Sequence, residues 1–236
     1  MKNPINIIMI CIGFNNYEKI YGQCIESHRK YASKFGYKYV LITTRASTPI
    51  TTSVWLKIPL IIRALEKKYD WVVTIDADCQ ISQIAPKLET LEVEDKSLYM
   101  AKGFSGRINS GVVIIKNTEA VKSLFKTIYT HSSNDVPEAD WGENGHVIHF
   151  ASQWHGLQLI DRKWNNNADP TLQDYIRHFS AGGPMRSLYP ATYTERIIGL
   201  VQYIKNRLNR KKYLPRNHVL TSVETLFHQV IKENYF

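Results

Sequence analysis

Short apolar runs alternate with helical stripes along the first half of the chain. Residues 5–14 are almost continuously apolar and rich in Ile, which predicts a strand buried on both faces. Residues 17–35 predict a helix that ends at Gly36, and residues 37–44 predict a second strand. This order implies parallel strands joined by a right-handed crossover, as in an α/β fold.

The next segment, residues 45–54, is polar and predicts a loop. An apolar stripe at helical spacing follows it, and this stripe places Lys57 near the start of the helix. Lys57 could therefore pair with a phosphate or a carboxylate, or could be an ordinary surface lysine. Further strands are expected at residues 98–101 and 112–115, and a helix is expected after them at residues 119–129.

The apolar run Trp71–Ile75 ends in two carboxylates, Asp76 and Asp78. Such a run predicts a buried strand, and open α/β folds bind ligands at the carboxyl ends of their strands. If the strand continued, the two carboxylates would share a face and repel each other, unless a cation lay between them or the chain turned into water. Mg²⁺ and Mn²⁺ prefer such oxygen ligands. The sequence thus predicts a metal site here in preference to a solvated acidic turn.

Polar residues also flank other predicted strands. Asn15 and Tyr17 follow the first strand, where a ligand would bind, although a turn and a helix cap explain them equally well. Asn109 and Ser110 precede the buried run at 112–115 and fit either a ligand contact or a Gly-rich turn.

Two later stretches carry a candidate metal ligand and candidate acids. His178 ends a short apolar strand and could add a nitrogen ligand to the two Asp, although a structural histidine is more frequent in such a place. Gly182 and Gly183 follow in a turn whose backbone can approach a phosphate closely. Asp140 and Glu143 are candidate site acids, but acidic residues are also common at helix starts.

The net charge of +9 is concentrated near the end of the chain. From Met185 onward, nine Lys or Arg stand against three Glu, which accounts for six of the nine positive charges. Apolar residues at helical spacing between 197 and 208 predict a basic amphipathic helix, which either docks on the core or lies on an anionic membrane surface. We therefore expect a catalytic domain at residues 1–190 and a basic helical extension at residues 191–236.

Composition limits the location and the partners. The three cysteines lack CxxC spacing and favour a reducing compartment, and no apolar run approaches the length of a membrane span. We expect a cytoplasmic protein, peripheral at the inner face of the membrane. The nearly balanced charge of the body disfavours nucleic-acid binding.

Three of these pieces, in their order, resemble the retaining glycosyltransferases of the GT-A fold. They are the strand with DxD, the Asn-Ser-Gly before a buried strand, and His-Phe-x-x-Gly-Gly-Pro near the end of the sheet. Families 8 (glycogenin and lipopolysaccharide galactosyltransferases) and 34 (galactosyl- and xylosyltransferases) are the most similar. Residues 27–39 are similar to the HR.YA...GY.Y opening of family 34, and residues 55–59 to the segment before DxD in both families.

The resemblance implies a fold, a donor and a set of site residues. The fold would be GT-A, with a mostly parallel central sheet flanked by helices. Asp76, Asp78 and His178 would hold Mn²⁺ or Mg²⁺ against the diphosphate of a nucleotide sugar, with a UDP-sugar as the expected donor. The implied donor contacts are Phe14, Asn15 and Tyr17 at the base, and Lys57, Ala77, Asn109, Ser110, Gly182 and Gly183 along the diphosphate and sugar. The implied catalytic group is Asp140, Glu143 and Asn144, and Glu143-Asn144 stands where family 34 carries Asp-Gln.

The implied activity is metal-dependent transfer of a sugar, with retention of configuration, onto a glycan or lipid-linked acceptor. Bacterial surface polysaccharide or lipopolysaccharide synthesis is the expected setting. A sugar nucleotidyltransferase of related fold is an alternative, weakened because no Gly-rich loop bearing Arg or Lys follows the first strand. A second alternative is a non-enzymatic protein that binds anions or membranes through its basic extension.

Overall fold

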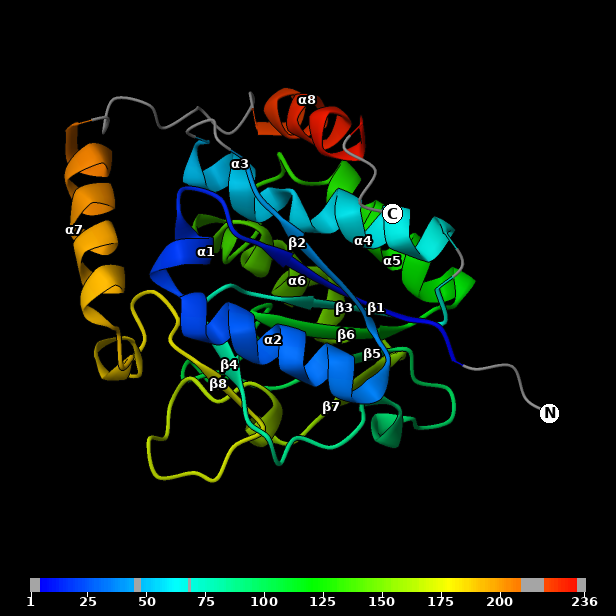
Figure 1. The fold of residues 1–236 in the computed structure, drawn as a ribbon. Helices are drawn as coiled ribbons and strands as arrows, with labels where there is room; N and C mark the ends of the chain where they lie inside the picture. Colours follow the sequence, from blue (N-terminus) through cyan, green and yellow to red (C-terminus); the bar gives the residue numbers. More distant parts are fainter. Residues whose placement is uncertain (1–4, 45–47, 68, 209–218, 233–236) are drawn as a thin grey trace.

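The computed structural model describes residues 5–44, 48–67, 69–208 and 219–232. Within these residues, eight α-helices surround a six-stranded sheet and a two-stranded sheet (Figure 1). The main sheet has the spatial order β2 (Lys38–Ile42), β1 (Ile7–Ile12), β3 (Trp71–Ile75), β6 (Val112–Lys116), β5 (Leu98–Met100) and β7 (Leu157–Leu159). The small sheet pairs β4 (Cys79–Ile81) with β8 (Ile176–His178).

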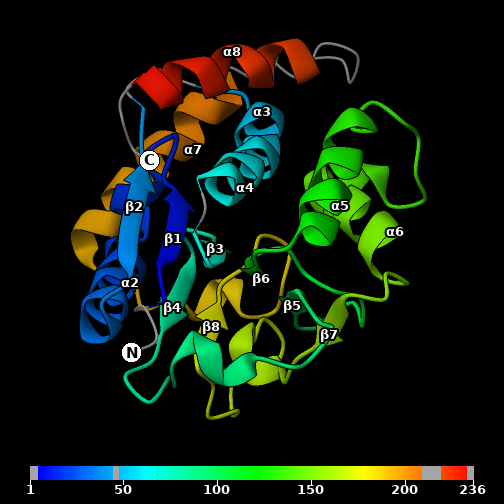
Figure 2. The ribbon, with the colours of Figure 1, turned by 90° about the vertical axis from the view of Figure 1, so that its right-hand side faces the viewer.

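Helices cover one face of the main sheet, and α2 with the small sheet covers the other (Figure 2). The helices on the first face are α3, α4, α5, α6 and α8. The α-helices are α1 (Tyr17–Ile20), α2 (Gly22–Phe35), α3 (Ile50–Trp55), α4 (Lys57–Glu66), α5 (Glu119–Thr130), α6 (Glu143–Ala151), α7 (Tyr193–Leu208) and α8 (Val219–Lys232).

The main sheet is mostly parallel, as the sequence predicts. Strand β1 runs parallel to β2 and β3, β5 runs parallel to β7, and β6 alone is antiparallel to its neighbours β3 and β5. Successive residues of β1 enter opposite cores: Ile7 and Met9 pack toward α2, whereas Ile8 and Ile10 pack toward α4. The continuous apolar run therefore reflects burial on both faces.

Two local expectations need correction. The helix predicted over residues 17–35 is interrupted at Tyr21, which separates α1 from α2. The loop predicted over residues 45–54 contains most of α3, although Thr and Val are weak helix formers. Thr52 and Trp55 are buried in α3, and this helix packs against α8, so tertiary packing overrides local propensity.

The two helices of the C-terminal extension behave differently. Val223, Leu226 and Val230 of α8 belong to the main hydrophobic core. Helix α7 stands at the side of the molecule next to α1 (Figure 1), where Asn16 Nδ2 donates to Gln202 Oε1 at 2.9 Å. The basic residues at positions 210–212 and 216 lie outside the described residues. Among the helices that the structure describes, none has the length and apolar character needed to cross a membrane.

Candidate active site

The candidate site lies at the sheet edge where β1 and β3 end and β6 begins. Because β6 is antiparallel to β3, with Val112 opposite Ile75, the segment just before β6 reaches the carboxyl end of β3. The backbone N–H of Asp76 donates to the Gly111 carbonyl at 2.8 Å. This register brings the Asn-Ser-Gly and DxD motifs together.

A cavity of about 290 Å³ opens at this edge. Most of the sequence-predicted site residues line it: Phe14, Asn15, Tyr17, Lys57, Asp76, Ala77, Asp78, Asn109, Ser110, Glu143, Asn144 and His178. Three others are not among the lining residues. Asp140 is exposed in a short 3₁₀ helix, and Gly182 and Gly183 lie in the turn beyond Ser180 and Ala181, which do line the cavity. The roles assigned to all these residues remain predictions.

The DxD segment is a turn and not a continuing strand. Strand β3 ends at Ile75, and the N–H of Cys79 donates to the Asp76 carbonyl at 3.0 Å. The turn is not solvated, however, because Asp78 is only 7% exposed. Asp76 keeps 37% of its side-chain surface exposed toward the cavity. Both carboxylates thus need partners, and each has a cationic one.

Lys57 is the partner of Asp76. It is the first residue of α4 and is 5% exposed. Its Nζ lies 2.9 Å from Asp76 Oδ1 and 3.1 Å from Glu143 Oε1, and it donates to the Ser110 carbonyl at 2.8 Å. Burial lowers the pKa of Lys57, but the two carboxylates raise it by more, so the pKa lies above its usual value. Lys57 is therefore a buried cation between two acids.

Helix α6 begins at the other side of the cavity. Glu143 is its first residue, and Glu143 Oε1 accepts a hydrogen bond from Ser110 Oγ at 2.9 Å. Asn144 Oδ1 accepts from the Ser110 backbone N–H at 2.8 Å. These bonds fix the start of α6 against the segment before β6, so Glu143 is held in place by both Lys57 and Ser110.

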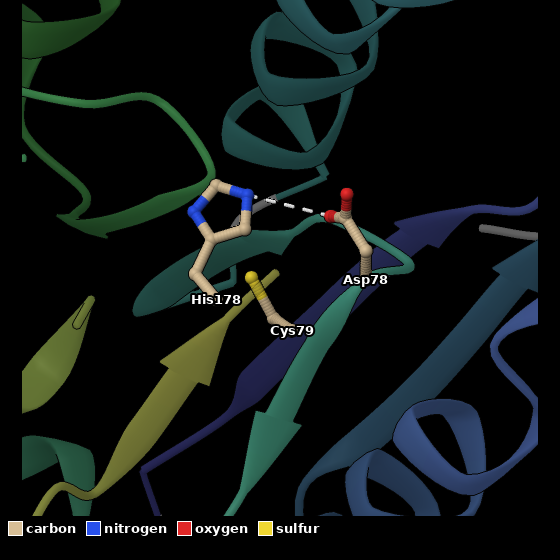
Figure 3. A group of neighbouring side chains, drawn as sticks. All are labelled: Asp78, Cys79 and His178. Atoms are coloured by element: carbon tan, nitrogen blue, oxygen red, sulfur yellow. Dashed lines mark ion pairs between the residues drawn. The ribbon is translucent and has the colours of Figure 1, made fainter. Parts of the chain in front are cut away.

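The side chains of His178 and Asp78 point toward each other (Figure 3), with His178 Nε2 at 3.4 Å from Asp78 Oδ1. Its Nδ1 lies 2.9 Å from Asn165 Oδ1. The Asn165 amide nitrogen donates to two oxygens of Asn109, so the Asn165 oxygen faces His178 and accepts from Nδ1–H. In the neutral imidazole, Nε2 then presents a lone pair to a carboxylate oxygen. Two acceptors face each other, and a proton or a cation must lie between them.

The donor set at this point fits a hard divalent cation. Ligands on neighbouring corners of an octahedron around Mg²⁺ are about 3 Å apart, close to the separation of Asp78 Oδ1 and His178 Nε2. The orienting bond to Nδ1 is also typical of metal-bound histidine. Cys79 lies in the same group, whose ligand atoms are within 4.8 Å of one another. Its thiol donates to the Gly111 carbonyl at 3.7 Å, and burial raises its pKa, so it is a poor ligand for such a cation.

Arg186 is a site residue that the sequence did not reveal. Its Nη1 donates to Asp78 Oδ2 at 2.8 Å and to the Phe179 carbonyl at 2.9 Å, and the guanidinium lies 4.9 Å from the centre of the Tyr21 ring. Burial raises the pKa of Asp78, but His178 and Arg186 lower it by more, so it lies below its usual value. Arg186 thus occupies one oxygen of Asp78 and leaves the other facing His178.

Asn165 is the second residue that the sequence did not reveal. It begins a run of three asparagines, 165–167, each at most 1% exposed. The sequence predicts this run as a polar bend, which usually lies at the surface. Buried amides must be hydrogen-bonded, and the structure shows their partners. Asn165 orients Asn109 and His178, Asn166 donates to Asp174 Oδ2 at 2.7 Å, and Asn167 accepts from the Phe104 backbone N–H at 2.8 Å.

Asn15 has a structural role at the end of β1. Its side-chain amide forms two hydrogen bonds with the backbone of Thr48, at 2.9 and 3.1 Å. Asn15 and Asn16 have φ of 55° and 63°, a left-handed conformation that Asn tolerates better than most residues. These residues form a turn, one of the two alternatives predicted for this segment, and Phe14 and Tyr17 flank it along the cavity.

The sequence matches no protein-family model, and no curated protein matches it. Solved structures do match. A glycosyltransferase involved in the glycosylation of the major capsid of PBCV-1 has a TM-score of 0.62 and 14% identity, covering 83% of this chain and 99% of that one. The galactosyltransferase LgtC, in complex with donor and acceptor sugar analogues, has a TM-score of 0.53 and 12% identity, covering 89% and 98%. The glycosyltransferase GlyE of Streptococcus pneumoniae TIGR4 has a TM-score of 0.55 and 11% identity, covering 94% and 64%.

These likenesses show a shared fold. The chain has the α/β fold of GT-A glycosyltransferases, with a mostly parallel sheet flanked by helices, as the sequence predicts.

Proposed function

We propose that this protein transfers a sugar from a nucleotide-diphosphate donor to a glycan or lipid-linked acceptor, with a divalent cation and with retention of configuration. The observation that carries the proposal is the facing pair of Asp78 Oδ1 and His178 Nε2, in a cavity that also holds Asp76, Lys57 and Glu143. When His178 Nε2 carries no proton, two acceptor atoms face each other where a cation would lie, and the Arg186 guanidinium holds the other oxygen of Asp78. The fold shared with glycosyltransferases supports the same reading.

The proposed division of labour follows from the positions of the side chains. Asp76, Asp78 and His178 would hold Mn²⁺ or Mg²⁺, which, when bound, neutralises charge on the departing diphosphate. Phe14 and Tyr17, at the end of β1, would contact the base of a UDP-sugar. The family 8 or family 34 affiliation belongs to this proposal.

We propose Glu143, a buried carboxylate that lines the cavity, as the group that acts at the reacting carbon. Sugar transfer passes through an oxocarbenium-like centre, and retention requires either a covalent carboxylate intermediate or attack on the same face as the leaving diphosphate. Both contacts of Glu143, with Lys57 and Ser110, fall on Oε1. A Glu143→Gln protein with more than about a tenth of normal turnover would exclude the covalent role, because a nucleophile of this kind cannot be replaced by an amide.

Helix α7 supports a peripheral membrane location. Its inward face is polar, since Glu195 and Gln202 are buried, whereas its outward face exposes Ile197, Leu200 and Ile204 by 46%, 60% and 48%. This is the reverse of a helix docked through its apolar stripe. Basic residues on the same helix fit an anionic lipid surface. These features support our proposal that the enzyme is peripheral at the inner face of the membrane. The proposed setting, bacterial surface polysaccharide or lipopolysaccharide synthesis, is compatible with this location.

Sedimentation with vesicles of anionic lipid tests this location. Wild-type protein should co-sediment, and a Leu200→Ser/Ile204→Ser variant should bind at least tenfold more weakly, a loss of about 1.4 kcal/mol. Neutral vesicles provide the control for the basic residues. Equal binding of the variant and the wild type would contradict the proposal.

The function itself is tested by a panel of nucleotide sugars, scored for hydrolysis with and without Mn²⁺. We expect one donor, a UDP-sugar, to be hydrolysed in a metal-dependent manner. Thermal stabilisation by UDP with Mn²⁺ serves as a second measurement, because a ligand that binds only the folded state raises its stability. Neither hydrolysis nor stabilisation with any UDP-, GDP- or CMP-based compound would overturn the proposal.

A further inference from the structure

Two large aromatic side chains stand exposed beside the candidate active site. Phe104 is 52% exposed and Trp141 is 46% exposed. Phe104 belongs to a tight turn closed by two backbone hydrogen bonds between Gly103, Gly106 and Arg107, at 2.8 and 2.9 Å. Trp141 precedes Glu143 by two residues. Exposed aromatic residues around a cavity commonly mark a ligand surface.

The turn that carries Phe104 is anchored to the cavity. The backbone N–H of Phe104 donates to Asn167 Oδ1 at 2.8 Å, and Asn167 is fully buried. Gly103 packs closely against Asn109, which lines the cavity: a Cβ atom added to Gly103 would lie 3.2 Å from Cβ of Asn109. On the other side, a Cβ atom added to Gly183 would lie 3.4 Å from the edge of the Phe104 ring, so the ring lies next to this glycine. Phe104 therefore stands between the Asn109 segment and the turn after β8.

Arg107 joins this turn to Trp141. Its guanidinium lies 5.4 Å from the centre of a Trp141 ring, within the range of a cation–π contact, and Nη1 lies 2.5 Å from Glu138 Oε1. The Arg107 side chain is 48% exposed, so it remains accessible. Arg107 therefore links the turn that carries Phe104 to Trp141, and we name Phe104, Arg107 and Trp141 together the aromatic rim. The rim neighbours the cavity through Gly103, which lies against Asn109, and through Trp141, which is two residues before Glu143.

We infer that the aromatic rim binds a pyranose unit of the acceptor glycan, an inference that rests on the proposed function. A pyranose ring presents an apolar C–H face, which packs on an aromatic ring, and hydroxyl groups at its edge, which need hydrogen-bonding partners. The rim offers both, because it carries two exposed aromatic rings together with the half-exposed Arg107 guanidinium and its partner Glu138. Trp141 stands two residues before Glu143, so a sugar bound at the rim would lie near the carboxylate proposed to act at the reacting end of the donor.

The test separates acceptor binding from donor binding. Labelled wild-type protein with UDP and Mn²⁺ is applied to an array of pyranose oligosaccharides, together with Phe104→Ala, Trp141→Ala and Trp141→Phe proteins. We expect each Ala variant to lose roughly tenfold in affinity for the oligosaccharides that the wild type binds, and Trp141→Phe to retain most of it. Ile84→Ala, which removes a side chain that is 51% exposed in another loop, is the control and should bind as the wild type does.

Donor-side measurements on the same proteins show which idea fails. Hydrolysis of the donor and stabilisation by UDP with Mn²⁺ should be unchanged in the rim variants, because none of the three side chains lines the cavity. If these signals are present and the Ala variants bind oligosaccharides as well as the wild type does, or the wild type binds none, the rim inference is wrong. If wild-type protein gives no donor signal, the proposed function fails first.

Discussion

Replacing Lys57 by Met should expose how strongly the site depends on one buried cation. Nζ compensates Asp76 at 2.9 Å and Glu143 at 3.1 Å, and the Glu143 side chain is only 6% exposed. Removing one partner from a buried ion pair costs about 3–5 kcal/mol, because the remaining charge stays buried without compensation. Asp76 is partly solvated, which places the expected loss near the lower end, at about 3 kcal/mol.

Urea denaturation at neutral pH measures this loss directly. For a chain of this length, about 3 kcal/mol corresponds to a fall in the melting temperature of roughly 6–12 °C. The matched control is Lys116→Met, because Lys116 pairs with Glu92 at the surface, where their side chains are 38% and 45% exposed. A surface pair contributes about 0–1 kcal/mol. Equal losses for the two variants would refute the argument from burial.

A double variant tests the mechanism of the loss. In Lys57→Met/Glu143→Gln, one of the two uncompensated carboxylates is gone. We expect the double variant to be more stable than the sum of the single losses predicts, by at least about 1 kcal/mol, because contacting charges are coupled. Strict additivity would show that Lys57 stabilises the protein through its packing and not through its charge.

Three further predictions concern groups around the site. Burial lowers the pKa of His28 to about 4, so between pH 6.5 and 4 the unfolded chain takes up a proton that the native protein does not. The free energy of unfolding should therefore fall by about 3 kcal/mol as the pH is lowered over this range. Urea denaturation of His28→Gln at the same pH values should show a flatter pH dependence than that of the wild type. Asn165→Ala removes the acceptor that orients His178 and should weaken Mn²⁺ binding about 10–100-fold by calorimetry, whereas unchanged affinity would exclude the orienting role. A Cβ on Gly111 would lie 2.1 Å from His178 Cε1, so Gly111→Ala should lower thermal stability by about 1–3 kcal/mol as well as Mn²⁺ affinity, and a neutral result would contradict the close contact.

The strands and the DxD edge could be predicted because their signals are local. The β-branched run that ends at Asp76 identifies a buried strand, and the shared edge follows from the parallel order of β1 and β3. The position of Lys57 at a helix start also follows from the apolar stripe. These features could be predicted because hydrophobic periodicity and the ends of helices and strands can be recognised from local sequence alone.

The partners of the site residues depend on contacts between distant segments. Arg186 meets Asp78 across 108 positions, and no spacing rule links them. The strand that ends at His178 was predicted and is β8, but β4 and its pairing with β8, which sets Cys79 opposite His178, were not predicted, because β4 has only three residues and its partner is about 100 positions away. Helix α3 was missed because its stability comes from packing against α8. In each case, tertiary contacts supply what local pattern lacks.

The most direct test of the central claim is a titration with Mn²⁺ followed by electron paramagnetic resonance of the free ion, in the presence of UDP. We expect one bound Mn²⁺ per wild-type chain, and loss of this binding in both Asp78→Asn and His178→Ala. Equal Mn²⁺ binding by the wild type and the two variants, or no UDP-dependent binding by the wild type, would contradict the claim that Asp78 and His178 share one cation.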